Sequence, residues 1–331
     1  MIHFLVITIV ASSLILCEEV KVQEIKLSGL ITDKKQEISG MDWYQDRLFL
    51  LPENMGGFLF SISKGEVLNA IKSGKKRPIT PKKTRFKTPD YSSLIKGFDG
   101  FEAIAFDGDK IYITIESEHR GEMVSYLAWG KIDSKSLEVV MNEEDLETIK
   151  TPIQLNNLSF ESLLINDENI IMIYEANGSN LRKNPTQSVF THRSKSISQI
   201  NFPNIEYRIT DATRMDNNDR FWVINYFWPG DKKLLNPGED SVLNKVKQGS
   251  SHFKSDQIER LVEFQMNEGE ISISDTKPIQ LFLESDASRN WEAVARLDDK
   301  GLLIATDKHP RMIFGYVPVS YTHLRAHETE T

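Results

Sequence analysis

Short apolar segments in this chain come in pairs, and a few polar residues separate the two members of each pair. In residues 101–117, "FEAIAFDGDKIYITIES", an apolar aromatic segment is followed by "DGDK" and then by alternating β-branched and aromatic residues. Turn residues of this kind between two β-forming segments are typical of a β-hairpin. We therefore expect two antiparallel strands, over 101–106 and 111–115.

This hairpin pattern occurs five times along the chain. The other four copies read "ISGMDWYQDRLFLLPEN", "FESLLINDENIIMIYEA", "ITDATRMDNNDRFWVINY" and "WEAVARLDDKGLLIATDK". The second positions of the five copies form a set that we call the first ring: Ser39, Glu102, Glu161, Thr210 and Glu292. Successive members lie 63, 59, 49 and 82 residues apart. Such intervals leave room for one four-stranded sheet per copy, and sheets repeated around an axis form a β-propeller.

The predicted fold class is therefore all-β, with a single β-propeller domain over residues 18–318. We expect five blades, or six if the long interval 211–291 contains a further copy. An open β-sandwich is the alternative, but it would not require five hairpins with the same internal spacing. The alternating segment 18–30 precedes the first hairpin. We expect this segment to supply the outermost strand of the last blade and to close the ring.

The two ends of the chain depart from this pattern. Residues 2–16 form an apolar run that is short for a membrane span and typical of a secretory signal. We expect residues 1–17 to be a signal peptide, or a lipoprotein signal with a lipid anchor at Cys17. A buried strand or an uncleaved anchor are the alternatives. The mature chain would then be exported to the periplasm or the extracellular space, without a transmembrane span. Residues 319–331 are expected to be a non-native or disordered tail.

The composition excludes one class of partner. The 331 residues carry a formal net charge of -8, whereas binding to nucleic acid needs a concentrated basic face. We therefore expect no nucleic-acid partner, and we expect a monomer. Because Cys17 is the only cysteine, the rest of the chain cannot form a disulfide.

Acidic residues recur at a second fixed position of the hairpins. Fourteen or fifteen residues after the first-ring positions stands a set that we call the second ring: Glu53, Glu116, Glu175, Asn225 and Asp307. In an antiparallel pair the start of one strand lies beside the end of the next, so the two rings should converge on one face around the axis. We expect Glu53, Glu116, Glu175 and Asp307 to supply the catalytic acid or base.

Carboxylates that are forced together repel one another unless a cation neutralises them. Hard oxygen donors without His or Cys suit Ca²⁺, so we expect a calcium ion on the axis, held by the first ring. The alternative is that each acid only accepts hydrogen bonds from backbone amides at a strand start.

Basic residues follow the second strands of the hairpins. Five of them are candidates for substrate binding: Arg120, Arg182, Lys308, His309 and Arg311. A metal ion flanked by such cations suits phosphoryl transfer, so we expect a small anionic ligand or substrate. Ordinary solvated loop charges are the alternative. The long polar insertion 228–257 is expected to form a lid over the site.

The series Ser, Glu, Glu, Thr, Glu at the starts of successive inner strands resembles three families of calcium-binding propellers. It is similar to the soluble calcium-activated nucleotidases (apyrases), to the SdiA-regulated periplasmic propellers, and to the family named esterase-like activity of phytase. The resemblance covers residues 36–318 and implies calcium on Ser39, Glu102, Glu161, Thr210 and Glu292. Where apyrases carry an Asp-Asp-Arg group after the first hairpin, this chain reads "LPENMGG".

Two functional classes follow from these observations. The first is an exported, calcium-dependent hydrolase of phosphate or other esters, with its site on the axial face. The second is a non-catalytic periplasmic or extracellular binding protein in which calcium is structural. The sequence does not identify the substrate.

Overall fold

The computed structural model describes residues 18–54, 56–74, 77–285 and 287–319. The expected signal peptide with Cys17, and residues 320–331 of the expected tail, lie outside these ranges. Strands dominate the described ranges, which confirms the all-β class. None of the helices described there is long and apolar enough to cross a membrane.

The described strands form five antiparallel units in chain order. Unit 1 contains β2 (Ile38–Tyr44), β3 (Arg47–Pro52), β4 (Gly57–Ser63) and β5 (Lys82–Lys87). Unit 2 contains β6 (Phe98–Asp107), β7 (Lys110–His119), β8 (Glu122–Ile132) and β9 (Val139–Lys150). Unit 3 contains β10 (Phe160–Asn166), β11 (Asn169–Tyr174), β12 (Thr186–Thr191) and β13 (Ser196–Asn201).

The last two units depart slightly from this order. Unit 4 contains β14 (Arg208–Ala212), β15 (Arg220–Phe227), β16 (Ile258–Asn267) and β17 (Glu270–Ile273), and β18 (Ile279–Gln280) also pairs with β16. Unit 5 contains β19 (Trp291–Leu297), β20 (Gly301–Thr306), β21 (Phe314–Pro318) and, on its outer edge, β1 (Gln23–Glu24). Because β1 pairs with β21, the segment 18–30 adds an outer strand to the last unit, as its alternating pattern predicted.

Outer strands also link neighbouring units. β5 pairs with β9 and β13 pairs with β17, in both cases in parallel. The hydrogen-bonded sheets of the described chain therefore contain eight, nine and four strands. Each parallel pairing is short, with partners at two positions for β5 with β9 and at one for β13 with β17.

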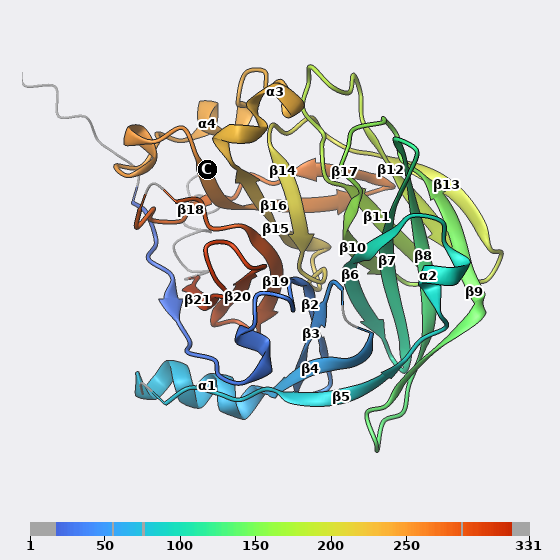
Figure 1. Ribbon diagram of the computed structural model, residues 1–331. Helices are drawn as coiled ribbons and strands as arrows, with labels where there is room; N and C mark the ends of the chain where they lie inside the picture. The colour runs from blue at the N-terminus through green and yellow to red at the C-terminus, as the bar shows by residue number, and fades with distance from the viewer. Residues whose placement is uncertain (1–17, 55, 75–76, 286, 320–331) are drawn as a thin grey trace, which may run out of the picture.

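The innermost strands of the units contact one another in a closed cycle. β2 contacts β6, β6 contacts β10, β10 contacts β14, β14 contacts β19, and β19 contacts β2. Figure 1 shows the units around a common centre, with these five strands nearest to it. The starts of all five inner strands are thus brought to the same axis.

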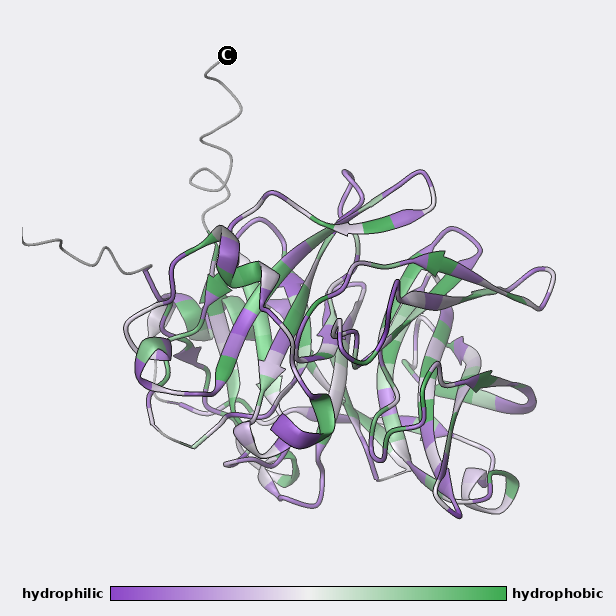
Figure 2. Ribbon diagram, turned by 90° about the horizontal axis from the view of Figure 1, so that it is seen from above, coloured by the Kyte–Doolittle hydropathy of each residue, from purple (hydrophilic) through white to green (hydrophobic). Residues whose placement is uncertain are grey.

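A hydrophobic core lies between each pair of neighbouring units. Phe49 of unit 1 packs with Ile113 of unit 2, and Trp222 of unit 4 packs with Trp291 of unit 5 in the same way. The other three clusters join units 2 and 3, units 3 and 4, and units 5 and 1. In Figure 2 the strands are mainly coloured as hydrophobic and many of the connecting loops as hydrophilic. Apolar burial between neighbouring units therefore holds them together.

Helices are confined to the connections. α1 (Lys64–Ser73) follows β4, and Ser63 and Glu66 form a capping box at its start. The others are α2 (Tyr91–Leu94), α3 (Lys232–Leu235), α4 (Ser241–Lys245), and the 3₁₀ turns η1 (Leu30–Thr32), η2 (Pro229–Asp231) and η3 (His252–Lys254). The insertion 228–257 thus contains α3, α4, η2 and η3.

Candidate functional site

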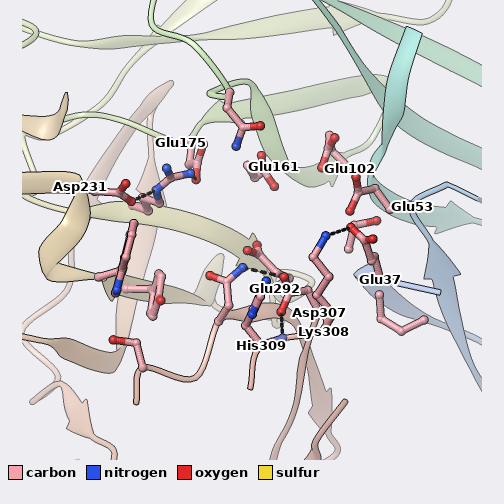
Figure 3. A pocket seen from close by; sticks show the side chains of 18 of the residues that line it. Glu37, Glu53, Glu102, Glu161, Glu175, Asp231, Glu292, Asp307, Lys308 and His309 are labelled. Carbon is pink, nitrogen blue, oxygen red and sulfur yellow. Dashed lines mark hydrogen bonds and ion pairs between the residues drawn. The ribbon is translucent and has the colours of Figure 1, made fainter. Parts of the chain in front are cut away.

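A cavity of about 670 Å³ opens where the inner strands converge. Ten carboxylates line it: Glu37, Glu53, Asp99, Glu102, Glu116, Glu161, Glu175, Asp231, Glu292 and Asp307. Two of the lining side chains, Arg208 and Lys308, carry a permanent positive charge. Figure 3 shows eight of these carboxylates, together with Lys308, around the cavity, and they come from several units. Both acid rings therefore converge on one site, as the hairpin spacing predicted.

Irregular strand pairing places the first ring. The register shifts between Ile38 and Gly40 in β2, and the same kind of shift occurs at the first-ring position of the other four inner strands. A β-bulge leaves a residue outside the ladder and changes the direction of its side chain. The bulges are the local reason why residues at a strand start can face the axis.

The two hydroxyl members of the first ring connect neighbouring units. The Ser39 hydroxyl donates a hydrogen bond of 2.5 Å to the carbonyl oxygen of Phe101, the residue before Glu102. The Thr210 hydroxyl donates a bond of the same length to the carbonyl oxygen of Trp291, the residue before Glu292. Ser39 lines the cavity, whereas Thr210 is fully buried and is not among the lining residues.

The three acidic members of the first ring line the same cavity, and within the described ranges no protein group donates a hydrogen bond to them. Glu102 and Glu161 are only 9% and 8% exposed, and Glu292 is partly buried. Burial raises the pKa of all three carboxyls well above the ordinary value, and the charges of neighbouring carboxylates, Asp307 first among them for Glu292, raise it further. Across the described ranges, none of these carboxylates accepts a hydrogen bond from a protein donor.

The acidic members of the second ring also line the cavity. Glu53 follows β3 directly, and burial together with the charge of Glu37 raises its pKa to about 8. Asp307 follows β20, and burial raises its pKa although it accepts hydrogen bonds from the backbone N–H of His309 and the side chain of Asn290. Both carboxyls can therefore hold a proton at a higher pH than a solvated one.

Glu116 and Glu175 differ in their partners. Burial raises the pKa of both to about 7, and the charge of Glu175 adds to this effect at Glu116. Arg208 Nη1 lies 2.5 Å from Glu175 Oε1, while its Nε donates to Asp231 Oδ2 at 2.8 Å. The other oxygen of Glu175, Oε2, is buried and has no hydrogen-bond partner among the described residues.

The fifth member of the second ring has a structural role. Asn225, in β15, is fully buried. Its amide donates to the carbonyl oxygens of Glu206 and Arg208 at 2.9 and 3.0 Å, and its Oδ1 accepts a bond from Arg260. It does not line the cavity.

Only part of the expected basic rim surrounds the cavity. Lys308 and His309 line it, and Lys308 Nζ lies 2.7 Å from Glu37 Oε2. Arg182 is buried away from the lining and donates to Asn177 Oδ1.

The other two candidates also lie off the lining. Arg311 pairs with Glu24 at 2.8 Å, and Arg120 occupies an exposed turn with φ +58°. The two cations that do line the cavity, Arg208 and Lys308, are each paired with a carboxylate, Glu175 and Glu37, respectively.

Several lining residues were not singled out from the sequence. Arg208 and Asp231 follow Glu175 by 33 and 56 residues in the sequence, so no local pattern predicts that Arg208 pairs with both carboxylates. Trp228 and Asp231 come from the start of the insertion 228–257, which places this edge of the insertion at the cavity, as expected for a lid. Trp228 is 53% exposed.

The described ranges contain no group of three or more His, Cys, Asp or Glu side chains that could hold a metal ion in the arrangement seen. The lining donors are nevertheless mostly carboxylate oxygens, which are the ligands of hard cations.

Comparison with known proteins gives a likeness of fold. Neither a protein-family model nor a curated protein matches the chain. Among solved structures, an exo-β-1,3-galactanase from Phanerochaete chrysosporium matches with a TM-score of 0.51 and 7% identity, over 91% of this chain and 65% of that one. A GH43 endo-arabinanase from Bacillus licheniformis matches with a TM-score of 0.49 and 9% identity, over 88% of this chain and 96% of that one. At the identity of the galactanase match, the likeness supports a propeller-type fold and nothing about the substrate.

Proposed function

We propose that the chain is a five-bladed β-propeller hydrolase whose active site is the axial cavity. The five antiparallel units are the blades in this account. The closed cycle of contacts β2–β6–β10–β14–β19 and the hydrophobic core between every neighbouring pair support this blade count. The galactanase match supports the fold but is too distant to carry over an activity.

A calcium ion on the axis is the second part of the proposal. The observation that carries it is the meeting of Glu102, Glu161 and Glu292, three carboxylates from three blades that accept no hydrogen bond from the described protein. Ca²⁺ takes six to eight oxygen ligands and accepts water among them. Because these side chains do not form a ready-made metal site, water would complete the shell around any bound ion. The ion would polarise a substrate oxygen or lower the pKa of a bound water.

Glu116 and Glu175 are suited to different roles in hydrolysis. The ion pair with Arg208 favours the charged form of Glu175. Both carboxyls have a pKa of about 7, so either could exchange a proton near neutral pH, but among the described residues only Glu175 is held in an ion pair. We assign the proton transfer to Glu116, because no ion pair restrains it, with Glu175 as its neighbour and Arg208 as the residue that positions Glu175.

The cavity wall bears on the class of ester. Arg208 and Lys308 are already paired, so a phosphate ester would find its positive partner only in the calcium ion. An uncharged or cationic ester needs no positively charged partner in the cavity. Extracellular calcium modules bind with dissociation constants of about 10⁻⁴–10⁻³ M, so export would supply the ion to a site of modest affinity.

A non-catalytic binding protein with a structural calcium is the alternative. The hydrogen bonds of Ser39 to Phe101 and of Thr210 to Trp291 favour it, because they show that first-ring residues already connect neighbouring units. A calcium ion among the other three members would extend the same connection around the axis.

Two matched variants separate these functions. The protein is screened against phosphate esters and acyl esters, with calcium and with EDTA. If the proposal holds, Glu116→Gln lowers turnover about 100-fold or more while calcium still raises the melting midpoint, because Gln keeps the shape but cannot exchange the proton. Glu161→Gln weakens both turnover and the calcium response. If no ester is hydrolysed while calcium still raises the melting midpoint, the result would favour the non-catalytic binding protein.

A further inference from the structure

One aromatic side chain at the cavity differs from the other tryptophans. Lys64, Lys195 and Arg289 lie against the rings of Trp43, Trp129 and Trp291, respectively, and the fourth, Trp222, is fully buried. No cation of the described chain lies over Trp228, which is the exposed tryptophan at the cavity. The ring is therefore open to a cation from outside the protein.

The backbone next to Trp228 fixes the position of its indole. Gly230 lies so close that a Cβ built on it would be 2.3 Å from Cη2 and Cζ3 of the ring. Asp231 donates its backbone N–H to the carbonyl oxygen of Trp228 at 2.9 Å, which closes a backbone turn over residues 228–231. The indole thus rests against its own turn, and Trp228 is one of the residues that line the cavity.

The wall beside Trp228 is acidic. Asp231 and Glu175 share Arg208, so one positive charge serves two carboxylates. Glu175 is 1% exposed, and its Oε2 has no partner within the described protein. A buried carboxylate oxygen that lacks a donor costs free energy until a donor or a cation reaches it.

An anion, a neutral ligand and an organic cation would interact differently with this acidic wall. An anion would meet ten carboxylates and two cations that are already paired. A neutral ligand could stack on the indole but would leave the excess negative charge unbalanced. An organic cation can both lie against the indole and balance the negative charge, because an aromatic face attracts a cation and the carboxylates supply the opposite charge.

We propose that the cavity binds a ligand with a substituted ammonium group, which lies against Trp228 and is balanced by the neighbouring carboxylates. This inference rests on the proposed function only in taking the axial cavity as the ligand site. It names the substrate class as a cationic small molecule, such as an ester with an ammonium group. Calcium on the axis and an ammonium group at Trp228 would occupy different parts of the cavity.

Choline serves as the probe in a calorimetric titration of the calcium-loaded protein. The matched ligand is its uncharged isostere, in which carbon replaces the ammonium nitrogen. We expect choline to bind at least about tenfold more tightly than the isostere, because only choline carries the charge. Trp228→Leu should weaken choline binding about tenfold, whereas Phe253→Leu, a change of another exposed aromatic residue outside the cavity lining, should leave it unchanged.

Several results would overturn the inference: equal affinity for choline and the isostere, no binding of choline, or equal binding by the wild type and Trp228→Leu. These outcomes are separable from failure of the proposed function. If calcium leaves the melting midpoint unchanged but choline binds through Trp228, the inference stands and the calcium proposal fails. If esters are hydrolysed and choline does not bind, the inference fails and the proposed function stands.

Discussion

The Ser39 hydroxyl shows how one first-ring side chain can serve both the fold and the cavity. It donates to a backbone oxygen of the next unit, and it lines the cavity at the same time. Its residue type and its place at a strand start were readable from the hairpin pattern. Its partner, Phe101, was not, because that contact depends on how two units pack.

Basic residues were harder to place from the sequence than acidic ones. The position of Arg182 after a strand suggested a place at the rim, but the side chain turns inward to Asn177. Nothing in the sequence around Arg208 predicts that it contacts two acids of the cavity. A long side chain reaches whichever partner folding brings near it, and local spacing does not encode that partner.

Ser39→Ala tests the contact between units. The change removes the hydrogen bond to Phe101 and leaves a buried carbonyl oxygen with one partner fewer. We expect the free energy of unfolding to fall by about 1 kcal/mol in urea titrations. The control is Ser194→Ala, because Ser194 is exposed and, among the described residues, its hydroxyl bonds only to Ser196, two residues away. An equal loss in both variants would mean that the Ser39 bond contributes no more than a surface one.

At the scale of elements, the hairpins were predictable because alternation and turn residues are local signals. The bulges were not, since a register shift appears only when two strands are paired. The parallel links β5–β9 and β13–β17 were also beyond the sequence, because they join strands of different units. The acids could therefore be assigned to the axial face, but the direction of each side chain could not.

Gly97 controls how β6 docks beside the end of β7. Its φ is +73°, and a Cβ there would lie 1.9 Å from the carbonyl oxygen of Glu118. Gly108, in the β6–β7 turn, also has a positive φ, +52°, but a Cβ there would meet nothing within 4 Å. We expect Gly108→Ala to cost about 1 kcal/mol of stability and Gly97→Ala at least about twice that, because only Gly97→Ala adds a clash. Denaturant titrations that gave equal costs would contradict this account of the docking.

At the scale of the whole molecule, ring closure turns five weak local patterns into one site. Each acid alone could simply accept hydrogen bonds from backbone N–H groups at the start of a strand. The closed cycle of inner strands brings ten carboxylates around one cavity, and burial then raises the pKa of several of them. The site is thus a property of the assembled ring rather than of any blade.

These raised pKa values predict how stability depends on pH without calcium. Glu53 and Glu116 have pKa values of about 8 and about 7 in the folded protein, against an ordinary value of 4.5. The folded state therefore binds protons more tightly than the unfolded chain. The stability that these groups contribute is fully present below about pH 4.5 and is lost as the pH rises through about 7 to 8. In EDTA, we expect the melting midpoint to be at least about 3 °C higher at about pH 5.5 than at about pH 8.5.

The most direct test of the central claim is the shift in melting midpoint when calcium is added at about pH 8.5, where the axial carboxylates are most highly charged. At a calcium concentration about 100 times the dissociation constant, the account predicts a rise of roughly 5 °C. Glu161→Gln should remove most of this rise, whereas Glu138→Gln, a change outside the cavity lining, should keep it. An unchanged midpoint in the wild-type protein, or an undiminished rise in Glu161→Gln, would contradict the claim that the axial carboxylates bind calcium.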